Sequence, residues 1–314
     1  MKLHDLVTKY ITYRKALGDK FRTSEIQLSL FCKIIGPNTN VQNITEESID
    51  KFFYNKKSHV TSSWFVKHYA LSGLYRYALT RGYVKYSPLP TKLPKRPSPF
   101  IPYIYSKQEL RQLISTALCY KKKKGQIEPY MIRTLLLVLY STGLRISEAL
   151  SLKLNDLDLD QNLIIVQNTK FHKSRFVPIS DQLHCILDEY LLWRAKYVGN
   201  CDGDLSVFPG TKNLPLKFST VHSIFQQIRL KAEVIRTDET TFQPRLHDLR
   251  HTFAVHSLIS WYQENKDIGK LLPILSTYMG HSRFSSTTVY LSITSDLLNE
   301  AHAKFEQYAA GDNE

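Results

Sequence analysis

Residues 247–254 read His-Asp-Leu-Arg-His-Thr-Phe-Ala, a short stretch dense in groups that can act on a phosphate. His247 and Arg250 are three positions apart, so in a helix over 247–263 their side chains share one face. A guanidinium keeps its charge at neutral pH and presents a planar fork that bonds two phosphate oxygens at once. An imidazole, whose ordinary pKa is near neutrality, can donate to a phosphate oxygen or accept a proton. These residue types suit phosphate chemistry, although a histidine taken alone more often has a structural role.

Two further patterns flank this stretch. Residues 142–148 read Thr-Gly-Leu-Arg-Ile-Ser-Glu, where Gly143 permits a sharp turn that presents Arg145 from the start of a helix. Residues 279–281 read Met-Gly-His, and Tyr290 follows nine residues after the histidine in Thr-Thr-Val-Tyr-Leu. Each pattern alone is weak, because such short strings occur by chance in many proteins.

In this order, and with a basic hairpin between the first two, the patterns resemble the phage-integrase or tyrosine-recombinase family. The resemblance spans roughly residues 106–290 and extends more weakly to the N-terminal third. The stretch 271–281, LLPILSTYMGH, is similar to recombinases borne by transposons and integrative elements.

The resemblance implies a set of catalytic residues: Arg145, Lys170, His247, Arg250, His281 and Tyr290. Tyr290 would be the nucleophile, although a phenol with a pKa near 10 needs a base or positive surroundings to attack. The two arginines would clamp the phosphate, His281 would donate a hydrogen bond to it, and Lys170 would protonate the departing 5′ oxygen. A turn that merely binds the DNA backbone is the alternative for Lys170.

The remaining polar residues near these patterns have supporting roles. Glu148 resembles the acidic residue that supports the first arginine. Lys173 and Arg175, in the basic turn, are expected to contact phosphates. His251 lies about 100° round the helix from Arg250 and is expected to support the site or to pack in the core.

The N-terminal third is strongly basic. The chain has a net charge of +14, and residues 1–100 hold 17 Lys and Arg against 6 Asp and Glu, a net of +11. Such an excess is typical of a polyanion-binding module, although a solvated basic surface is the plain alternative. We expect Lys67, Arg76 and Arg81, on a helix over 62–80, to bind DNA.

The fold class is expected to be mainly α with a small β-hairpin or sheet in the catalytic domain, in two domains. Residues 1–87 would be a helical DNA-binding domain, of the core-binding, SAM-like kind that the resemblance implies. Six prolines between 87 and 105 indicate a basic linker over 88–105. A mixed α+β catalytic domain would occupy 106–314, opened by a capping box of Ser106 and Glu109.

Local patterns place the elements of both domains. Helices are expected over 3–17, 24–35, from 45, 62–80, from 106, 128–141, from 146, 181–197, 219–232, 247–263, 268–279 and 297–308, and strands over 162–167 and 174–179.

Several classes of function are disfavoured. No run of about 18 apolar residues indicates a membrane helix, and Cys32, Cys119, Cys185 and Cys201 are scattered without metal-ligand spacing. No GxxxxGK[ST] loop is present. We therefore expect no metal, no cofactor and no membrane partner, in a cytoplasmic protein that acts on nucleoid-associated DNA.

The expected function is site-specific recombination of double-stranded DNA through a 3′-phosphotyrosyl intermediate, for integration, excision or resolution of a mobile element. The resemblance implies a homotetramer on DNA, with accessory DNA-bending proteins as further partners. The helix from about 297 could dock in cis or on a neighbouring subunit. A type IB topoisomerase-like enzyme, which relaxes a single plasmid, and a catalytically silent architectural DNA-binding protein, which forms no adduct, are the alternatives.

Overall fold

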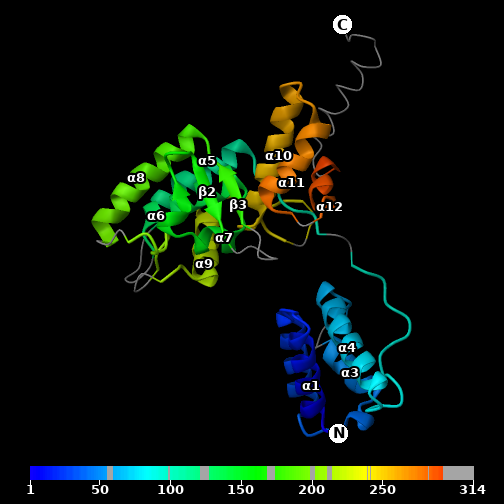
Figure 1. Cartoon of the computed structure of the whole chain (residues 1–314). Helices are drawn as coiled ribbons and strands as arrows, with labels where there is room; N and C mark the ends of the chain where they lie inside the picture. Colours follow the sequence, from blue (N-terminus) through cyan, green and yellow to red (C-terminus); the bar gives the residue numbers. More distant parts are fainter. Residues whose placement is uncertain are drawn as a thin grey trace, which may run out of the picture. The chain divides into compact units, whose positions relative to one another are not determined.

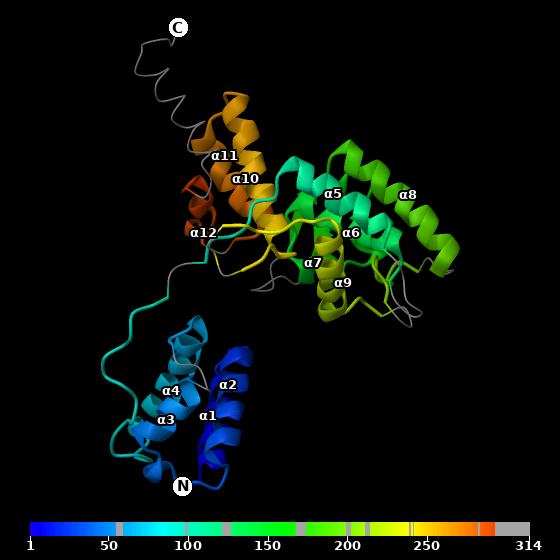
Figure 2. The ribbon, with the colours of Figure 1, turned by 180° about the vertical axis from the view of Figure 1, so that it is seen from behind.

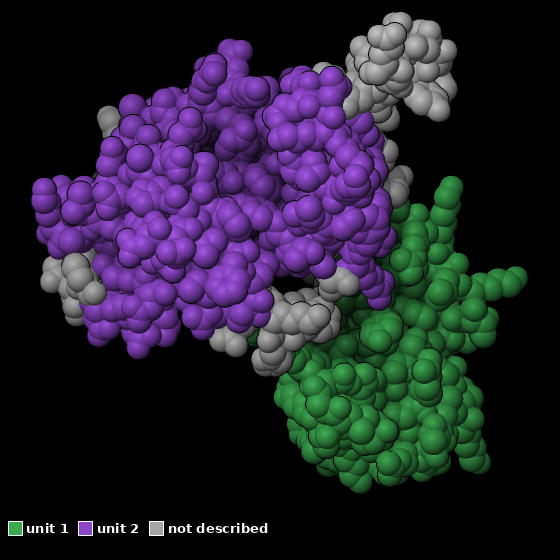
Figure 3. Space-filling model, turned by 45° about the horizontal axis from the view of Figure 1, so that its top comes forward, with its two compact units in different colours: residues 1–100 green, residues 101–314 purple. Residues whose placement is uncertain are grey.

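The computed structural model describes residues 1–54, 59–97, 100–120, 127–167, 174–198, 202–210, 214–238, 240, 242–281 and 283–292. The chain divides into two compact units, Met1–Phe100 and Ile101–Glu314, which Figure 3 colours separately. The expected boundaries at 87/88 and 105/106 stay predictions.

Unit 1 is helical. Its elements are α1 (Leu3–Ala16), α2 (Arg22–Ile35), the short 3-10 helix η1 (Val41–Asn43), α3 (Glu46–Tyr54) and α4 (Ser62–Thr80). Glu46 and Glu47 lie in the first turn of α3, where negative charge is favourable. The helices enclose a core of large apolar side chains that includes Leu28, Phe31, Phe52, Trp64, Leu71 and Leu74.

Unit 2 holds the other helices: α5 (Lys107–Leu118), α6 (Pro129–Thr142), α7 (Ile146–Ser151), α8 (Asp181–Val198), α9 (Phe218–Lys231), α10 (Asp248–Gln263), α11 (Ile268–Met279) and α12 (Ser285–Thr288), with the 3-10 turns η2 (Leu154–Asp156) and η4 (Val289–Ser292). The expected capping box of Ser106 and Glu109 opens α5. Helix α6 is apolar nearly all round, and accordingly it packs against α5, α8 and α10 at the centre of the unit (Figure 1).

A small antiparallel sheet, in the order β1-β2-β3, lies in the same unit. Its strands are β1 (Leu157–Asp158), β2 (Leu163–Val166) and β3 (Arg175–Pro178). Ile164 pairs with Val177, and both side chains are fully buried. The expected strands and the mainly helical fold class are thus confirmed, and β1 is an addition whose two residues are too short for a periodic pattern.

Helices α10 and α11 form a second core within unit 2 that brings the C-terminal residues of the fold together. The two helices lie side by side, with α12 beside α11 (Figures 1 and 2). Their apolar contacts include Ala254, Val255, Leu258, Leu272, Leu275, Met279 and Tyr290. This packing places η4, which contains Tyr290, directly against α10.

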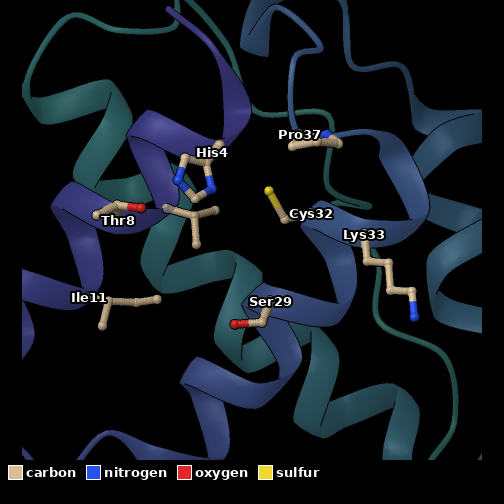
Figure 4. A pocket seen from close by; sticks show the side chains of 8 residues that line it. His4, Thr8, Ile11, Ser29, Cys32, Lys33 and Pro37 are labelled. Carbon is tan, nitrogen blue, oxygen red and sulfur yellow. The ribbon is translucent and has the colours of Figure 1, made fainter.

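Unit 1 contains a cavity of about 430 Å³ against α1 and α2 (Figure 4). Its lining is His4, Val7, Thr8, Ile11, Ser29, Cys32, Lys33 and Pro37. The predicted catalytic residues all belong to unit 2, so this cavity is not the candidate active site. In the described parts of the chain, no helix has the length and apolarity needed to cross a membrane.

Candidate active site

Arg145 follows the turn that ends α6. Gly143 has a φ of +60°, a left-handed conformation that favours glycine, and a side chain there would collide with the ring of Phe253. The turn presents Arg145 at the start of α7, where its guanidinium donates to the Glu148 carboxylate at 2.7 Å and its backbone N–H donates at 2.9 Å. The Arg145 side chain remains 32% exposed, so it can still reach a ligand.

Arg250 lies in the first turn of α10 and is almost fully buried. Its Nη1 donates to the Gly143 carbonyl at 2.6 Å and its Nη2 donates to the Met279 carbonyl at 2.7 Å. Burial and the neighbouring Arg145 lower the pKa of Arg250 to about 10, which leaves the guanidinium charged at neutral pH. Arg250 therefore brings a fixed positive charge into a poorly hydrated part of the unit.

Three arginines converge on the C-terminal end of α11. The carbonyl of Tyr278 accepts from Arg175 at 2.9 Å, that of Met279 from Arg250 at 2.7 Å and that of Gly280 from Arg145 at 2.7 Å. The last carbonyls of a helix lack partners within the helix and form its negative end, so cations are stabilised there. The end of α11 thus serves as a scaffold that gathers three guanidinium groups.

Glu148 joins two of these arginines. Its carboxylate accepts from Arg175 at 3.1 and 2.8 Å as well as from Arg145, and its side chain is 9% exposed. Burial alone would raise the pKa of Glu148, but the hydrogen bonds from Arg175 and Arg145 outweigh it and lower the pKa to about 2. Glu148 is consequently ionised at neutral pH and balances part of the positive charge of the cluster.

Two of the site histidines lie at the ends of α10 and α11. His247 immediately precedes α10, and burial, Arg250 and Arg245 lower its pKa. His281 follows α11, and its Nδ1 is 2.7 Å from the Thr287 hydroxyl oxygen. Burial, Arg250 and Arg145 lower the pKa of His281 to about 4, so its ring is uncharged at neutral pH.

Tyr290 is the buried tyrosine of this site, with 3% of its surface exposed. Its ring stacks on His281 at 6.2 Å between centroids, and its hydroxyl lies 3.1 Å from Nδ1 of His251. Burial raises the pKa of Tyr290, whereas Arg250 and Arg145 lower it. The phenol is therefore protonated at neutral pH, and two guanidinium groups favour its ionised form.

The structure brings together most of the predicted site residues: Arg145, Glu148, His247, Arg250, His281 and Tyr290. Their catalytic roles stay predictions. Lys170 and Lys173 lie outside the described residues. Arg76 and Arg81 are exposed on and just after α4, as a DNA contact requires.

Two of the predicted DNA contacts are corrected. Lys67 is only 6% exposed, because its ammonium donates to the carbonyls of Phe52 and Phe53 at 2.6 and 3.1 Å and so closes the end of α3. Arg175 is not a free phosphate contact: its guanidinium is committed to Glu148 and to the Tyr278 carbonyl, with a side chain 11% exposed. Both residues stabilise the protein's own fold.

His251 is the residue whose contact the sequence did not reveal. The expectation that it supports the site or packs in the core named no partner, and the structure places it against the Tyr290 hydroxyl. Its spacing of four from His247 puts both histidines on one face of α10, which was the available signal. The two rings meet edge to face at 5.0 Å between centroids. Among the described residues, no group of three or more His, Cys, Asp and Glu could hold a metal ion.

The chain matches the family model of the phage integrases over residues 105–296. A Sinorhizobium fredii protein described as an integrase/recombinase, y4rB, is 31% identical over 96% of this chain and 96% of its own length. The tyrosine recombinase XerC of Bacillus pumilus is 33% identical over 74% of this chain and 71% of its own.

Solved structures share the fold. A variant of the Tn1549 transposon integrase in complex with transposon right end DNA aligns with a TM-score of 0.69 at 17% identity, over 98% of this chain and 100% of that one. A lambda integrase dimer bound to a core site aligns with a TM-score of 0.66 at 17% identity, over 93% and 78%. The resemblance seen in the sequence is thus confirmed: the chain belongs to the phage integrase family of tyrosine recombinases and is a DNA strand-exchange enzyme that acts in site-specific recombination.

Proposed function

We propose that the enzyme cuts DNA by attack of Tyr290 on the scissile phosphate, which leaves a 3′-phosphotyrosyl link and a free 5′ hydroxyl. The observation that supports this most strongly is the burial of Tyr290 in a site where the charges of Arg250 and Arg145 favour its ionised form. A 5′ hydroxyl from a partner duplex then attacks the link and restores a phosphodiester. Because the covalent link conserves the energy of the broken bond, the cycle requires no nucleotide cofactor.

The arginines have the role of stabilising the transition state. Attack on phosphorus concentrates two negative charges on a crowded phosphorane, and preorganised cations in a poorly hydrated site stabilise such charge strongly. Arg145 and Arg250 each use N–H groups on the helix end and have further N–H groups for phosphate oxygens. His247 and His281 are the proposed hydrogen-bond donors to the same phosphate.

Lys170 is the proposed general acid for the 5′ oxygen, and Lys173 a proposed phosphate contact. The position of the neighbouring strand β3 supports both roles. Arg175, the first residue of β3 and five residues after Lys170, is held by Glu148 at the arginine cluster. Strand β3 therefore begins beside the arginines.

The basic N-terminal unit is proposed to bind the same DNA. Arg76 and Arg81 are exposed, and the net charge of +11 over residues 1–100 favours a polyanion. We propose the domain boundaries expected from the sequence: a DNA-binding domain over 1–87, a linker over 88–105 and a catalytic domain over 106–314.

We further propose that four copies assemble on two duplexes, since complete exchange between two duplexes breaks four phosphodiesters, one on each strand, and that accessory DNA-bending proteins assist. The element moved is proposed to be a mobile one, in the cytoplasm on nucleoid-associated DNA. The likeness of 271–281 to transposon-borne recombinases supports this. The C-terminal tail helix expected from about 297 lies outside the described residues.

Covalent trapping tests the proposed chemistry. Nicked duplexes from the enzyme's own genetic neighbourhood lose a short 5′-hydroxyl fragment after cleavage, so the adduct accumulates and survives denaturation. Tyr290→Phe should abolish the adduct while binding persists. Tyr278→Phe is the matched control, because that hydroxyl donates to the Pro178 carbonyl rather than to the histidines. An adduct that persists in Tyr290→Phe would refute the proposal.

A further inference from the structure

Tyr290 and His251 form a direct pair in the candidate site. Nδ1 of His251 lies 3.1 Å from the Tyr290 hydroxyl oxygen, with the ring centroids 5.7 Å apart and the planes inclined by 59°. We propose that His251 is a catalytic residue that orients the Tyr290 hydroxyl and accepts its proton as the phenol attacks phosphorus. The inference rests on the proposed function and assigns to His251 the base role that the sequence pattern offered to His247.

Both partners are held by rigid packing. His251 lies in the first turns of α10, and Tyr290 in η4 contacts the same helix. The Tyr290 ring packs in a core with Ala254 and Val255, which follow His251 along α10 and are fully buried. The 3.1 Å contact is therefore set by a helix and the core beneath it, which is the kind of preorganisation that a nucleophile requires.

Both partners of this hydrogen bond are uncharged at neutral pH. Burial, followed by the charges of His247, Arg245, Arg250 and His281, lowers the pKa of His251 to about 3, so its imidazole is neutral at neutral pH. Burial raises the pKa of Tyr290, so the phenol keeps its proton. In the tautomer that this proposal requires, Nε2 holds the ring's hydrogen and the Tyr290 hydroxyl donates to the unprotonated Nδ1. This arrangement leaves the oxygen lone pairs free to meet phosphorus.

The other two histidines are placed differently. His281 presents its face to Tyr290, with the planes inclined by 28°, and its Nδ1 is paired with the Thr287 hydroxyl. His247 meets the His251 ring edge to face rather than the tyrosine. Among the histidines that the structure describes, His251 is the one whose ring nitrogen is within hydrogen-bond distance of the nucleophilic oxygen, as a general base must be.

The Tyr290 Oη–P bond forms as the P–O5′ bond breaks, and the phenolic proton passes to Nδ1 of His251. The 5′ oxygen receives a proton from the general acid proposed at Lys170. In rejoining, the 5′ hydroxyl attacks phosphorus and the imidazolium returns its proton to the departing Tyr290 oxygen. The negative charge of the bound phosphate favours the imidazolium and so strengthens the base during the reaction.

Three variants test the proposal. His251→Leu retains bulk without a polar atom, and His251→Asn retains a hydrogen-bond acceptor that is not a proton acceptor. His256→Leu is the matched control, because His256 is on the same helix and its Nδ1 lies 3.0 Å from another tyrosine hydroxyl, that of Tyr140. The rate of adduct formation is measured at saturating nicked duplex, and Kd is measured separately on an uncleaved duplex.

We expect His251→Leu to slow cleavage by about 10²–10⁴-fold, the usual contribution of a general base, with Kd changed by less than about threefold. His251→Asn should cleave faster than His251→Leu and more slowly than the wild type, and His256→Leu should cleave at the wild-type rate. Wild-type cleavage by both His251 variants would overturn the proposal, as would a loss in His251→Leu explained wholly by Kd. If His251→Leu fails to bind DNA, the comparison of His251→Asn with the wild type decides alone, with equal rates counting against the proposal.

A change of leaving group distinguishes a base that acts on Tyr290 from an acid that acts on the departing 5′ oxygen. A substrate with sulfur in place of the bridging 5′ oxygen needs no proton on its leaving group. It should restore cleavage by Lys170→Ala but not by His251→Leu, and rescue of His251→Leu would place His251 on the leaving-group side and refute the assignment. A wild-type enzyme that forms no adduct would refute the proposed function itself, which is a distinct outcome.

Discussion

Arg175 donates two hydrogen bonds to Glu148, at 3.1 and 2.8 Å, and Glu148 is also the carboxylate that holds the guanidinium of Arg145. Strand β3 is thereby linked to the turn that presents Arg145. The same Arg175 reaches the Tyr278 carbonyl at the end of α11. Three separate segments of the chain are therefore fixed by one side chain.

Arg175→Lys tests the contribution of these hydrogen bonds. A lysine keeps the charge but cannot reproduce the planar fork that bonds Glu148 twice while also reaching Tyr278. We expect the rate of covalent cleavage at saturating DNA to fall at least about tenfold, because about 1.4 kcal/mol of lost transition-state stabilisation suffices for that factor. Kd for DNA should change little, since Arg175 is not a free phosphate contact. A large loss of affinity at an unchanged cleavage rate would contradict this role.

The acid stability of the protein should depend on Glu148. Its pKa in the fold is about 2, below the ordinary value of 4.5, so ionised Glu148 stabilises the fold fully above pH 4.5. This contribution is lost as pH falls from 4.5 towards 2. Urea unfolding at several pH values should show a steeper loss in the wild type than in Glu148→Gln, by up to about 1.4 kcal/mol per pH unit. Parallel curves for the two proteins would contradict the prediction.

Gly280→Ala should disturb the arginine cluster beyond ordinary backbone strain. Gly280 has a φ of +68°, and a Cβ there would lie 2.8 Å from Nη1 of Arg175. Gly82→Ala is the matched control, because Gly82 has the same φ of +68° and no neighbour within 4 Å. Strain of about 1–2 kcal/mol is expected in both variants. Cleavage should fall in Gly280→Ala alone, and equal activity in both variants would contradict the steric argument.

In unit 1, the buried Lys67 and the exposed Arg81 should affect different properties of the protein. Lys67→Met keeps the aliphatic stem but leaves two buried carbonyls without their donor, so the free energy of unfolding should fall by about 1–3 kcal/mol. The dependence of DNA affinity on salt should stay unchanged in Lys67→Met. Arg81→Ala should instead reduce the slope of log K against log salt by about 1 for one lost phosphate contact, with little effect on stability. A reduced salt slope in Lys67→Met without loss of stability would show that Lys67 binds DNA after all.

Features set by neighbouring residues could be predicted from the sequence. The capping box of Ser106 and Glu109 and the turn at Gly143 depend on residues a few positions apart, and both occur as expected. The uniformly apolar pattern of residues 128–141 correctly indicated a central helix, because burial on every side leaves no polar face.

The contacts that the sequence could not show, and the two corrected predictions at Lys67 and Arg175, involve residues distant in the sequence. Arg175 meets the Tyr278 carbonyl across 103 positions, and His251 meets Tyr290 across 39. Lys67 resembled a DNA contact because its position on α4 beside aromatic residues is compatible with either a solvated or a buried ammonium. The carbonyls at the end of α3 decide between them, and only the packing of α3 against α4 shows those carbonyls.

Peptide mapping of the trapped adduct is the most direct test of the central claim. Trypsin cleavage after Arg283 and Lys304 releases a peptide, residues 284–304, whose single tyrosine is Tyr290. Mass spectrometry of the digested wild-type adduct should find a nucleotide attached through its 3′ phosphate to Tyr290 in this peptide. A nucleotide attached to any other residue, or through a 5′ phosphate, would contradict the assignment of Tyr290 as the nucleophile.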